Sequence, residues 1–128
     1  MIAHPVNPSS TEIREWAYDA AAPEPDQDFH LVLARVRHEK EYLEFVSDPH
    51  CPKRWYFLDI LYLIVGDAVR YEYKSLPEPI LRGFLSLAER YPDKSVQLWR
   101  ERSLDLMRNP KSFDFKAWCG GGYAKAAT

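Results

Sequence analysis

The sequence predicts a single all-α domain, residues 1–128, of five or six helices packed around a central apolar helix at about residues 54–74. The core of that helix is the run WYFLDILYLIVGDAV, from Trp55 to Val69, which holds two charges and no proline. It is longer than a typical buried strand of about 4–8 residues. It is also shorter than the roughly 20 apolar residues that cross a bilayer. The length of the chain suits one domain with one hydrophobic core.

The first helix is predicted to begin after Ser9. Ser9 and Glu12 have the spacing of a capping box, in which each side chain accepts a hydrogen bond from the other residue's backbone N–H. One face of this helix is apolar and consists of Ile13, Trp16, Ala17 and Ala20. Pro23 and Pro25 follow and cannot continue a helix. We therefore expect a loop between about 21 and 28.

Residues 28–46 are compatible with two structures. Read as one helix, the segment has two apolar faces. The first comprises Phe29, Val32, Leu33, Val36 and Leu43, and the second comprises Leu31, Ala34, Tyr42 and Phe45. HLVLARV, at 30–36, also suits a strand, although no hairpin signal or second strand run follows it. The segment DPHCPKR at 48–54 is then a loop.

The central helix is expected to bury Phe57, Leu61, Ile64, Val65 and Ala68 almost completely. Gly66 lowers helix propensity by about 1 kcal/mol, so its presence predicts that a neighbouring element approaches closely.

Three further helices are predicted after the sequence LPEP. The first runs from Ile80 to Tyr91, with Pro79 in its first turn. The second spans 93–109 and the third, in SFDFKAWC, is stopped by the glycines at 120–122. We expect residues 1–8 and 120–128 to be frayed.

Metal, cofactor and nucleic-acid sites are not expected. The histidines and cysteines show none of the usual ligand spacings; they are His4, His30, His38, His50, Cys51 and Cys119. Cys119 before three glycines is better explained as a small buried thiol than as a nucleophile. Tyr71 to Lys74 interleaves aromatic and basic residues, but the acidic total of the chain argues against nucleic acid. Without a signal peptide or membrane segment, and with two unpaired thiols, we expect a cytoplasmic protein.

Charge is distributed unevenly along the chain. Residues 1–28 hold six acidic residues against Arg14 alone, a net charge of −5, whereas residues 76–128 hold nine basic and six acidic residues, a net of +3. This favours a non-enzymatic protein-interaction module, for example an immunity-type inhibitor, whose partner is a protein with a basic surface. The predicted contact residues are Glu15, Tyr18, Asp19, Glu24 and Asp26. The competing interpretation is that this segment docks on the chain's own basic C-terminal half.

A different class of function is a small helical enzyme or ligand-binding protein with a polar pocket. Its residues would be Asp59, Asp67, Arg70 and Arg100. Arg100 projects from the apolar face of its helix, so it either pairs with Asp59, Asp67 or Asp114 or extends its head to solvent. Because no catalytic motif is present, the sequence favours the interaction module without excluding an enzyme.

Overall fold

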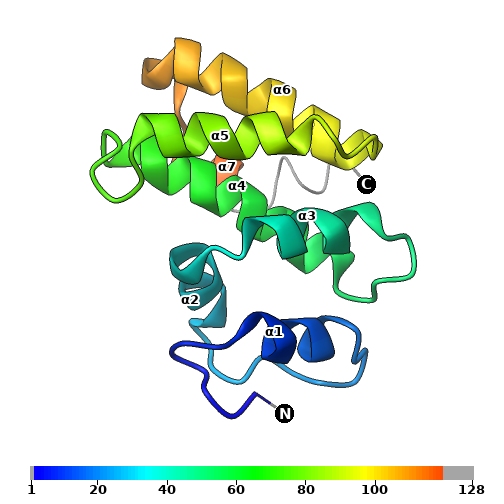
Figure 1. Ribbon diagram of the computed structural model, residues 1–128. Helices are drawn as coiled ribbons and strands as arrows, with labels where there is room; N and C mark the ends of the chain where they lie inside the picture. The colour runs from blue at the N-terminus through cyan, green and yellow to red at the C-terminus, as the bar shows by residue number, and fades with distance from the viewer. Residues whose placement is uncertain (1, 120–128) are drawn as a thin grey trace.

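The computed structural model describes residues 2–119, which form seven α-helices and one short 3₁₀-helix and contain no strand (Figure 1). The elements are α1 (Ser10–Ala17), α2 (Phe29–Val36), α3 (Glu39–Ser47), α4 (Arg54–Arg70), α5 (Glu78–Ala88), α6 (Lys94–Arg108), η1 (Pro110–Ser112) and α7 (Phe115–Cys119). The all-α single domain is confirmed, but the predicted count of five or six helices is too low, because residues 28–46 form two helices and not one. The glycines at 120–122 lie outside the described residues.

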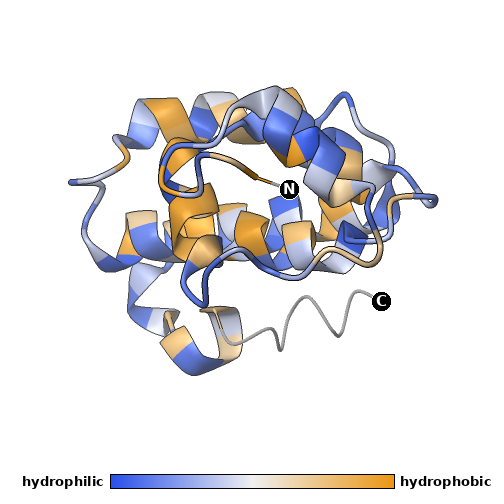
Figure 2. Ribbon diagram, turned by 90° about the horizontal axis from the view of Figure 1, so that it is seen from below, coloured by the Kyte–Doolittle hydropathy of each residue, from blue (hydrophilic) through white to orange (hydrophobic). Residues whose placement is uncertain are grey.

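Helix α4 contacts α2, α3, α5, α6 and α7. Figure 1 shows α5 and α6 side by side at one end of the molecule and α1 at the other, with α3 and α4 between them. Viewed from the α1 end, the start of the chain lies over the middle of this face (Figure 2). The N-terminal segment and the basic C-terminal helices are therefore at opposite ends.

Helix α4 is apolar on nearly every side, which is typical of a helix buried within a domain. Eleven of its seventeen residues are buried. The five side chains expected to be buried are each at most 3% exposed, which confirms that prediction; they are Phe57, Leu61, Ile64, Val65 and Ala68.

The helix ends at Arg70, four residues earlier than the expected Lys74. The N–H of Tyr73 donates to the carbonyl of Ala68 at 2.7 Å, and the N–H of Glu72 donates to Val69 at 3.2 Å. These two bonds form a Schellman motif, which satisfies carbonyls at the end of a helix. Glu72 and Tyr73 have φ values of 55° and 62°. A left-handed residue at this position is usually glycine, so the sequence carried no signal for this end.

Residues 28–46 are neither one helix nor a strand. The chain breaks at Arg37, whose φ of 52° is left-handed, and His38 precedes the first turn of α3. Tyr42 and Phe45 belong to α3 and are fully buried, whereas Leu31 of α2 is 48% exposed. The predicted second apolar face therefore does not exist as one surface, because its residues belong to two separate helices.

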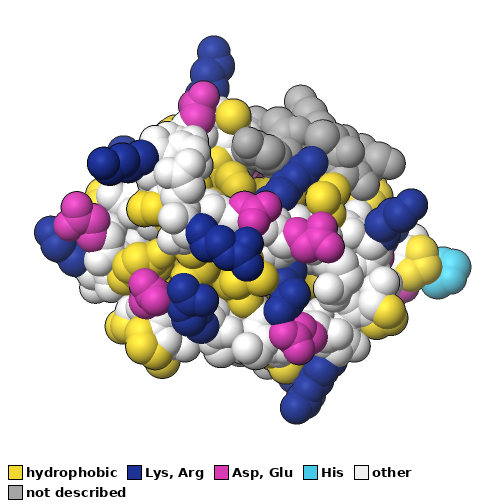
Figure 3. Space-filling view, turned by 90° about the horizontal axis from the view of Figure 1, so that it is seen from above, with side chains coloured by type: hydrophobic (Ala, Val, Ile, Leu, Met, Phe, Trp, Pro, Cys, Tyr) yellow, Lys and Arg dark blue, Asp and Glu magenta, His cyan; other side chains and the backbone are white. Residues whose placement is uncertain are grey.

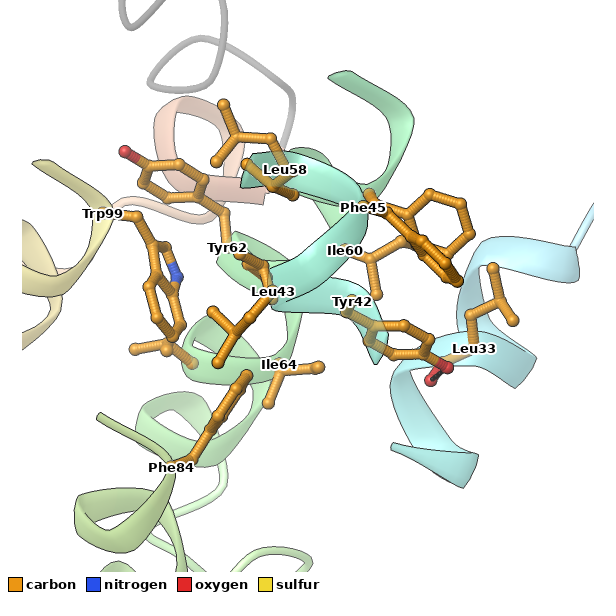
Figure 4. Packing of buried hydrophobic residues seen from close by; sticks show 14 of the residues in the cluster. Leu33, Tyr42, Leu43, Phe45, Leu58, Ile60, Tyr62, Ile64, Phe84 and Trp99 are labelled. Atoms are coloured by element: carbon orange, nitrogen blue, oxygen red, sulfur yellow. Dashed lines mark hydrogen bonds between the residues drawn. The ribbon is translucent and has the colours of Figure 1, made fainter. Parts of the chain in front are cut away.

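The core is built where α3, α4, α5 and α6 meet. Figure 4 shows Leu43, Tyr62, Phe84 and Trp99 converging from these four helices. Trp99 is fully buried, and its ring centroid lies 5.1 Å from that of Phe84. Burying an aromatic side chain of this size stabilises the fold by roughly 1.5–3 kcal/mol.

Side chains of α6 cap the last turn of α5. Arg100 Nε donates to the carbonyl of Leu85 at 3.0 Å, and its Nη2 pairs with Glu89 Oε1 at 2.5 Å. Gln97 Nε2 donates to the carbonyl of Ala88 at 2.9 Å. These bonds satisfy carbonyls that the end of α5 leaves without intrahelical partners. The expected pairing of Arg100 with Asp59, Asp67 or Asp114 is therefore wrong, and so is the solvent-exposed alternative.

Helix α7 packs against Gly66, as its position in α4 predicts. Trp118 Nε1 donates to the carbonyl of Tyr62 at 2.7 Å, and the indole is buried. A methyl group at position 66 would lie 2.6 Å from Cys119 Sγ and 2.7 Å from Trp118 Cδ1. These distances are shorter than van der Waals contact, so only glycine lets α7 dock in this position.

Gly66→Ala is expected to destabilise the protein even though alanine favours helix by about 1 kcal/mol, because the new methyl displaces Trp118. Gly83 is the matched control, since a methyl group there would meet no atom within 4 Å. Gly83→Ala should raise the midpoint of urea unfolding, and Gly66→Ala should lower it. If both variants were equally stabilised, α7 would not pack on α4 as described.

Candidate functional site

Trp16 anchors the N-terminal part of the chain to the domain. The capping box is formed as predicted, with Glu12 N–H donating to Ser9 Oγ at 3.1 Å. It sets the start of α1, which buries Ile13, Trp16 and Ala17; Ala20 lies beyond the helix and is exposed.

The indole of Trp16 is packed on three sides. Its ring lies 5.1 Å from Phe29 and 5.2 Å from Tyr56 between centroids. Its Nε1 donates to the carbonyl of Pro23 at 3.0 Å. This bond ties the loop that follows α1 to the helix, so the loop has a defined position.

A groove of about 530 Å³ lies between α1, this loop and the start of the chain. Six of the residues that line it are apolar: Ile2, Pro5, Trp16, Ala22, Pro23 and Pro25. The two others are the acidic residues Asp19 and Glu24. We call this site the acidic groove. It combines an apolar wall, rigid because three of its residues are prolines, with two carboxylates.

Glu12 holds residues 2–8 against α1 and so shapes one wall of the acidic groove. Its carboxylate accepts hydrogen bonds from the backbone N–H of Ala3 at 2.9 Å, His4 at 3.2 Å and Ser9 at 3.1 Å. These bonds, above all the one from Ser9, lower the pKa of Glu12 to about 2. Ile2 is only 6% exposed. Residues 2–8 are thus held in place, in contrast to the fraying that the sequence suggested.

The carboxylates of the predicted contact residues have local roles as well. Asp19 and Asp26 each accept a backbone N–H two residues ahead, at 3.1 and 2.9 Å, and so shape the loop. Glu24 accepts the hydroxyl of Tyr56 at 2.9 Å. Glu15, Asp19, Glu24 and Asp26 are all exposed. The loop therefore displays its acidic side chains in fixed positions.

Lys53 is a cation in contact with two residues that line the acidic groove. Its Nζ lies 4.4 Å from the centroid of the Trp16 ring and donates to the carbonyls of Trp16 and Asp19. These are carbonyls at the end of α1, where a cation is favourable. One ammonium group faces two carboxylates, Asp19 and Glu24, so it neutralises the groove only in part.

Tyr18 does not line the acidic groove. Its hydroxyl donates to Asp48 at 2.7 Å, and its ring packs against Phe45 with 5.9 Å between centroids. Burial raises the pKa of Tyr18 to about 12. The residue as a whole is still 41% exposed. Of the five predicted contact residues, Asp19 and Glu24 meet in the groove, and the others lie outside its lining.

The interpretation that the acidic segment docks on the basic C-terminal half is wrong. Helix α1 packs on α3, and Arg14 pairs with Glu44 at 2.9 Å. The face over α5 and α6 lies at the opposite end and mixes Lys and Arg with Asp and Glu side chains (Figures 1 and 3). The segment docks on residues 44–57 and on Phe29, and it does so through hydrogen bonds and ring packing as well as charge.

The residues of the alternative polar pocket are not brought together. Asp59 is exposed, and Arg100 lies on α5 as described above. The Arg70 guanidinium sits between the rings of Tyr71 and Phe115, at 5.1 and 4.6 Å from their centroids. Asp67 and Arg70 line two different cavities. The cavity at Asp67 contains none of the other three residues and is treated below.

Cys119, the candidate nucleophile of the sequence, is not activated in the fold. Burial raises the pKa of Cys119 to about 12, so its thiol is protonated at neutral pH and is a poor nucleophile. Among residues 2–119, His, Cys, Asp and Glu side chains form no group of three or more that could hold a metal ion. No helix within this stretch has the length and apolar character that a membrane span requires.

The chain matches no known protein-family model, and no curated protein or solved structure resembles it significantly. Its function must therefore be argued from its own residues.

Sequence reasoning missed the apolar part of the groove. The prolines at 23 and 25 were interpreted only as helix breakers, and Ile2 was assigned to a frayed end. Two signals were present in the sequence: a large apolar residue at position 2, and alternating proline and acid in APEPDQD. Neither signal indicates by itself that the two segments meet beside Trp16.

Glu12→Gln is expected to lower the melting temperature at neutral pH, since the neutral amide accepts weaker hydrogen bonds. The pKa of Glu12 is lowered from 4.5 to about 2 on folding. Its contribution to stability is therefore full above pH 4.5 and is lost as the pH falls toward 2. The variant should lose less stability than the parent over this interval. Glu15→Gln, on the same helix and exposed, is the control and should follow the parent; equal slopes for all three proteins would contradict the role of Glu12.

Proposed function

We propose that this protein is a non-enzymatic, cytoplasmic interaction module whose acidic groove binds a basic, partly apolar segment of a partner protein. The observation that carries the proposal is the groove itself, where Trp16 and three prolines adjoin Asp19 and Glu24. An immunity-type inhibitor that neutralises a basic protein is one concrete form of such a module.

The groove has the composition and size of a binding site. Pockets that bury a ligand typically have volumes of about 300–1,000 Å³ and are mostly apolar with a few polar groups that set orientation; this one measures about 530 Å³. An apolar side chain of the partner would occupy the space beside Trp16, and a neighbouring Lys or Arg would meet the carboxylates. The net charge of −5 over residues 1–28 would accelerate encounter with a basic surface.

The alternative class, a small enzyme or ligand-binding protein built on Asp59, Asp67, Arg70 and Arg100, is less well supported. Its four residues occupy separate places, and the Arg100 guanidinium is occupied by Leu85 and Glu89. Asp67 lines a cavity that contains none of the other three residues.

Photo-cross-linking tests the proposal directly. A photoreactive amino acid is placed at Ala21, an exposed residue between two that line the groove, or at Glu101, an exposed residue of α6. After irradiation in cells of the native host, cross-linked peptides are identified by mass spectrometry. We expect position 21 to capture a segment in which Lys or Arg neighbours apolar residues. Capture of the same proteins from position 101, or of acidic segments, would contradict the proposal.

Neutralising Asp19 and Glu24 of the groove, together with the neighbouring Asp26, should weaken binding of the captured segment without unfolding the protein. In the triple variant Asp19→Asn, Glu24→Gln, Asp26→Asn, each side chain keeps an oxygen that can accept its present hydrogen bond. Exposed ion pairs contribute about 0.2–1 kcal/mol each, so affinity should fall about fivefold or more at low salt and less at high salt. Calorimetric titration with a synthetic peptide measures this. Unchanged affinity with an unchanged melting temperature would contradict the role of the carboxylates.

A further inference from the structure

We propose that a second site, the cavity beside Asp67, binds a small zwitterion of the α-amino-acid type with an apolar side chain. The cavity lies between α2, α4 and residues 75–76 and has a volume of about 210 Å³. It shares no lining residue with the acidic groove. The inference therefore stands or falls independently of the proposed function.

Asp67 supplies the negative group of this site. It is half-buried on α4, a helix whose other residues are mostly apolar. Burial raises the pKa of this carboxyl group, and the guanidinium of Arg70 only partly opposes the effect. On the α7 side its titratable neighbour is the Cys119 thiol, which is protonated at neutral pH and therefore carries no charge. A carboxylate kept partly desolvated beside a cavity is a recurrent feature of functional sites, and an ammonium group is its natural partner.

Two arginines from α2 and its C-terminal end supply positive charge to the same cavity. Arg35 donates through Nη2 to the carbonyl of Val6 at 2.6 Å, and Arg37 Nη1 lies 3.6 Å from Glu39 Oε1. Each guanidinium has five N–H donors, so both keep donors for a carboxylate of the ligand. A ligand that carries both signs matches this arrangement better than a simple cation or anion.

The volume of the cavity and its apolar lining restrict the size and the side chain of the ligand. The volume is below the range of about 300–1,000 Å³ that is usual for larger ligands, which favours a ligand smaller than a nucleotide. The apolar lining consists of Leu31, Ala34, Ile64 and Leu76. A branched aliphatic side chain suits these walls.

The test is an NMR titration of the isotope-labelled protein. The probes are L-leucine, L-isoleucine, L-valine and L-methionine, together with two fragments of leucine: 3-methylbutylamine, which lacks the carboxylate, and 4-methylpentanoate, which lacks the ammonium. We expect at least one amino acid to cause saturable shifts in the amides of residues 31–37, 64–67 and 75–76. The two fragments should bind at least about tenfold more weakly than the amino acid. This corresponds to a loss of about 1.4 kcal/mol or more of binding free energy.

Asp67→Asn should abolish the saturable shifts while the protein stays folded, because a neutral amide of the same shape is easier to bury than a carboxylate. Asp59→Asn is the control on the same helix and should leave binding unchanged. The proposal is overturned if no amino acid binds up to its solubility limit. It is also overturned if binding persists in Asp67→Asn, or if the shifts map to other residues.

Discussion

The burial of α4 on nearly all of its surface is the constraint on which the rest of the structure depends. A helix with eleven buried residues out of seventeen cannot be covered by one neighbour. Each large aliphatic or aromatic side chain left in water would cost roughly 1.5–3 kcal/mol. The chain therefore wraps α2, α3, α5, α6 and α7 around this one helix. These short helices leave only part of α4 exposed, including Trp55, Asp59 and Arg70.

The acidic groove is held in place by contacts with the first turns of α4. Tyr56 and Phe57 contact the Trp16 ring, at 5.2 and 6.0 Å between centroids, and Lys53 donates to the end of α1. Trp16 in turn holds the loop that carries Asp19 and Glu24. A contiguous chain of packed rings thus connects the core to the groove. These contacts give a loop rich in proline and acidic residues a fixed shape at the edge of a small domain. A partner that binds to it would therefore lose little free energy to ordering the loop.

The sequence was a good guide where the signal is local. The capping box, Pro79 in the first turn of α5 and the close approach at Gly66 were all predicted. It was a poor guide where a non-glycine residue adopts a left-handed conformation, as Arg37 and Glu72 do, because no residue type marks such a break. It also failed for Arg100 and for the lining of the groove. Those depend on which helix lies opposite, and this is decided by packing over the whole domain rather than by spacing along one helix.

Amide hydrogen exchange tests the central claim most directly, since it measures the free energy of opening at each residue. If α4 is the element that everything else covers, amides of residues 58–69 should exchange only through global unfolding and should be the slowest in the protein. The amides of residues 20–28 should exchange faster, through local opening that leaves α4 protected. Exchange of α4 at the rate of these loop amides, under conditions where the protein is folded, would contradict the account.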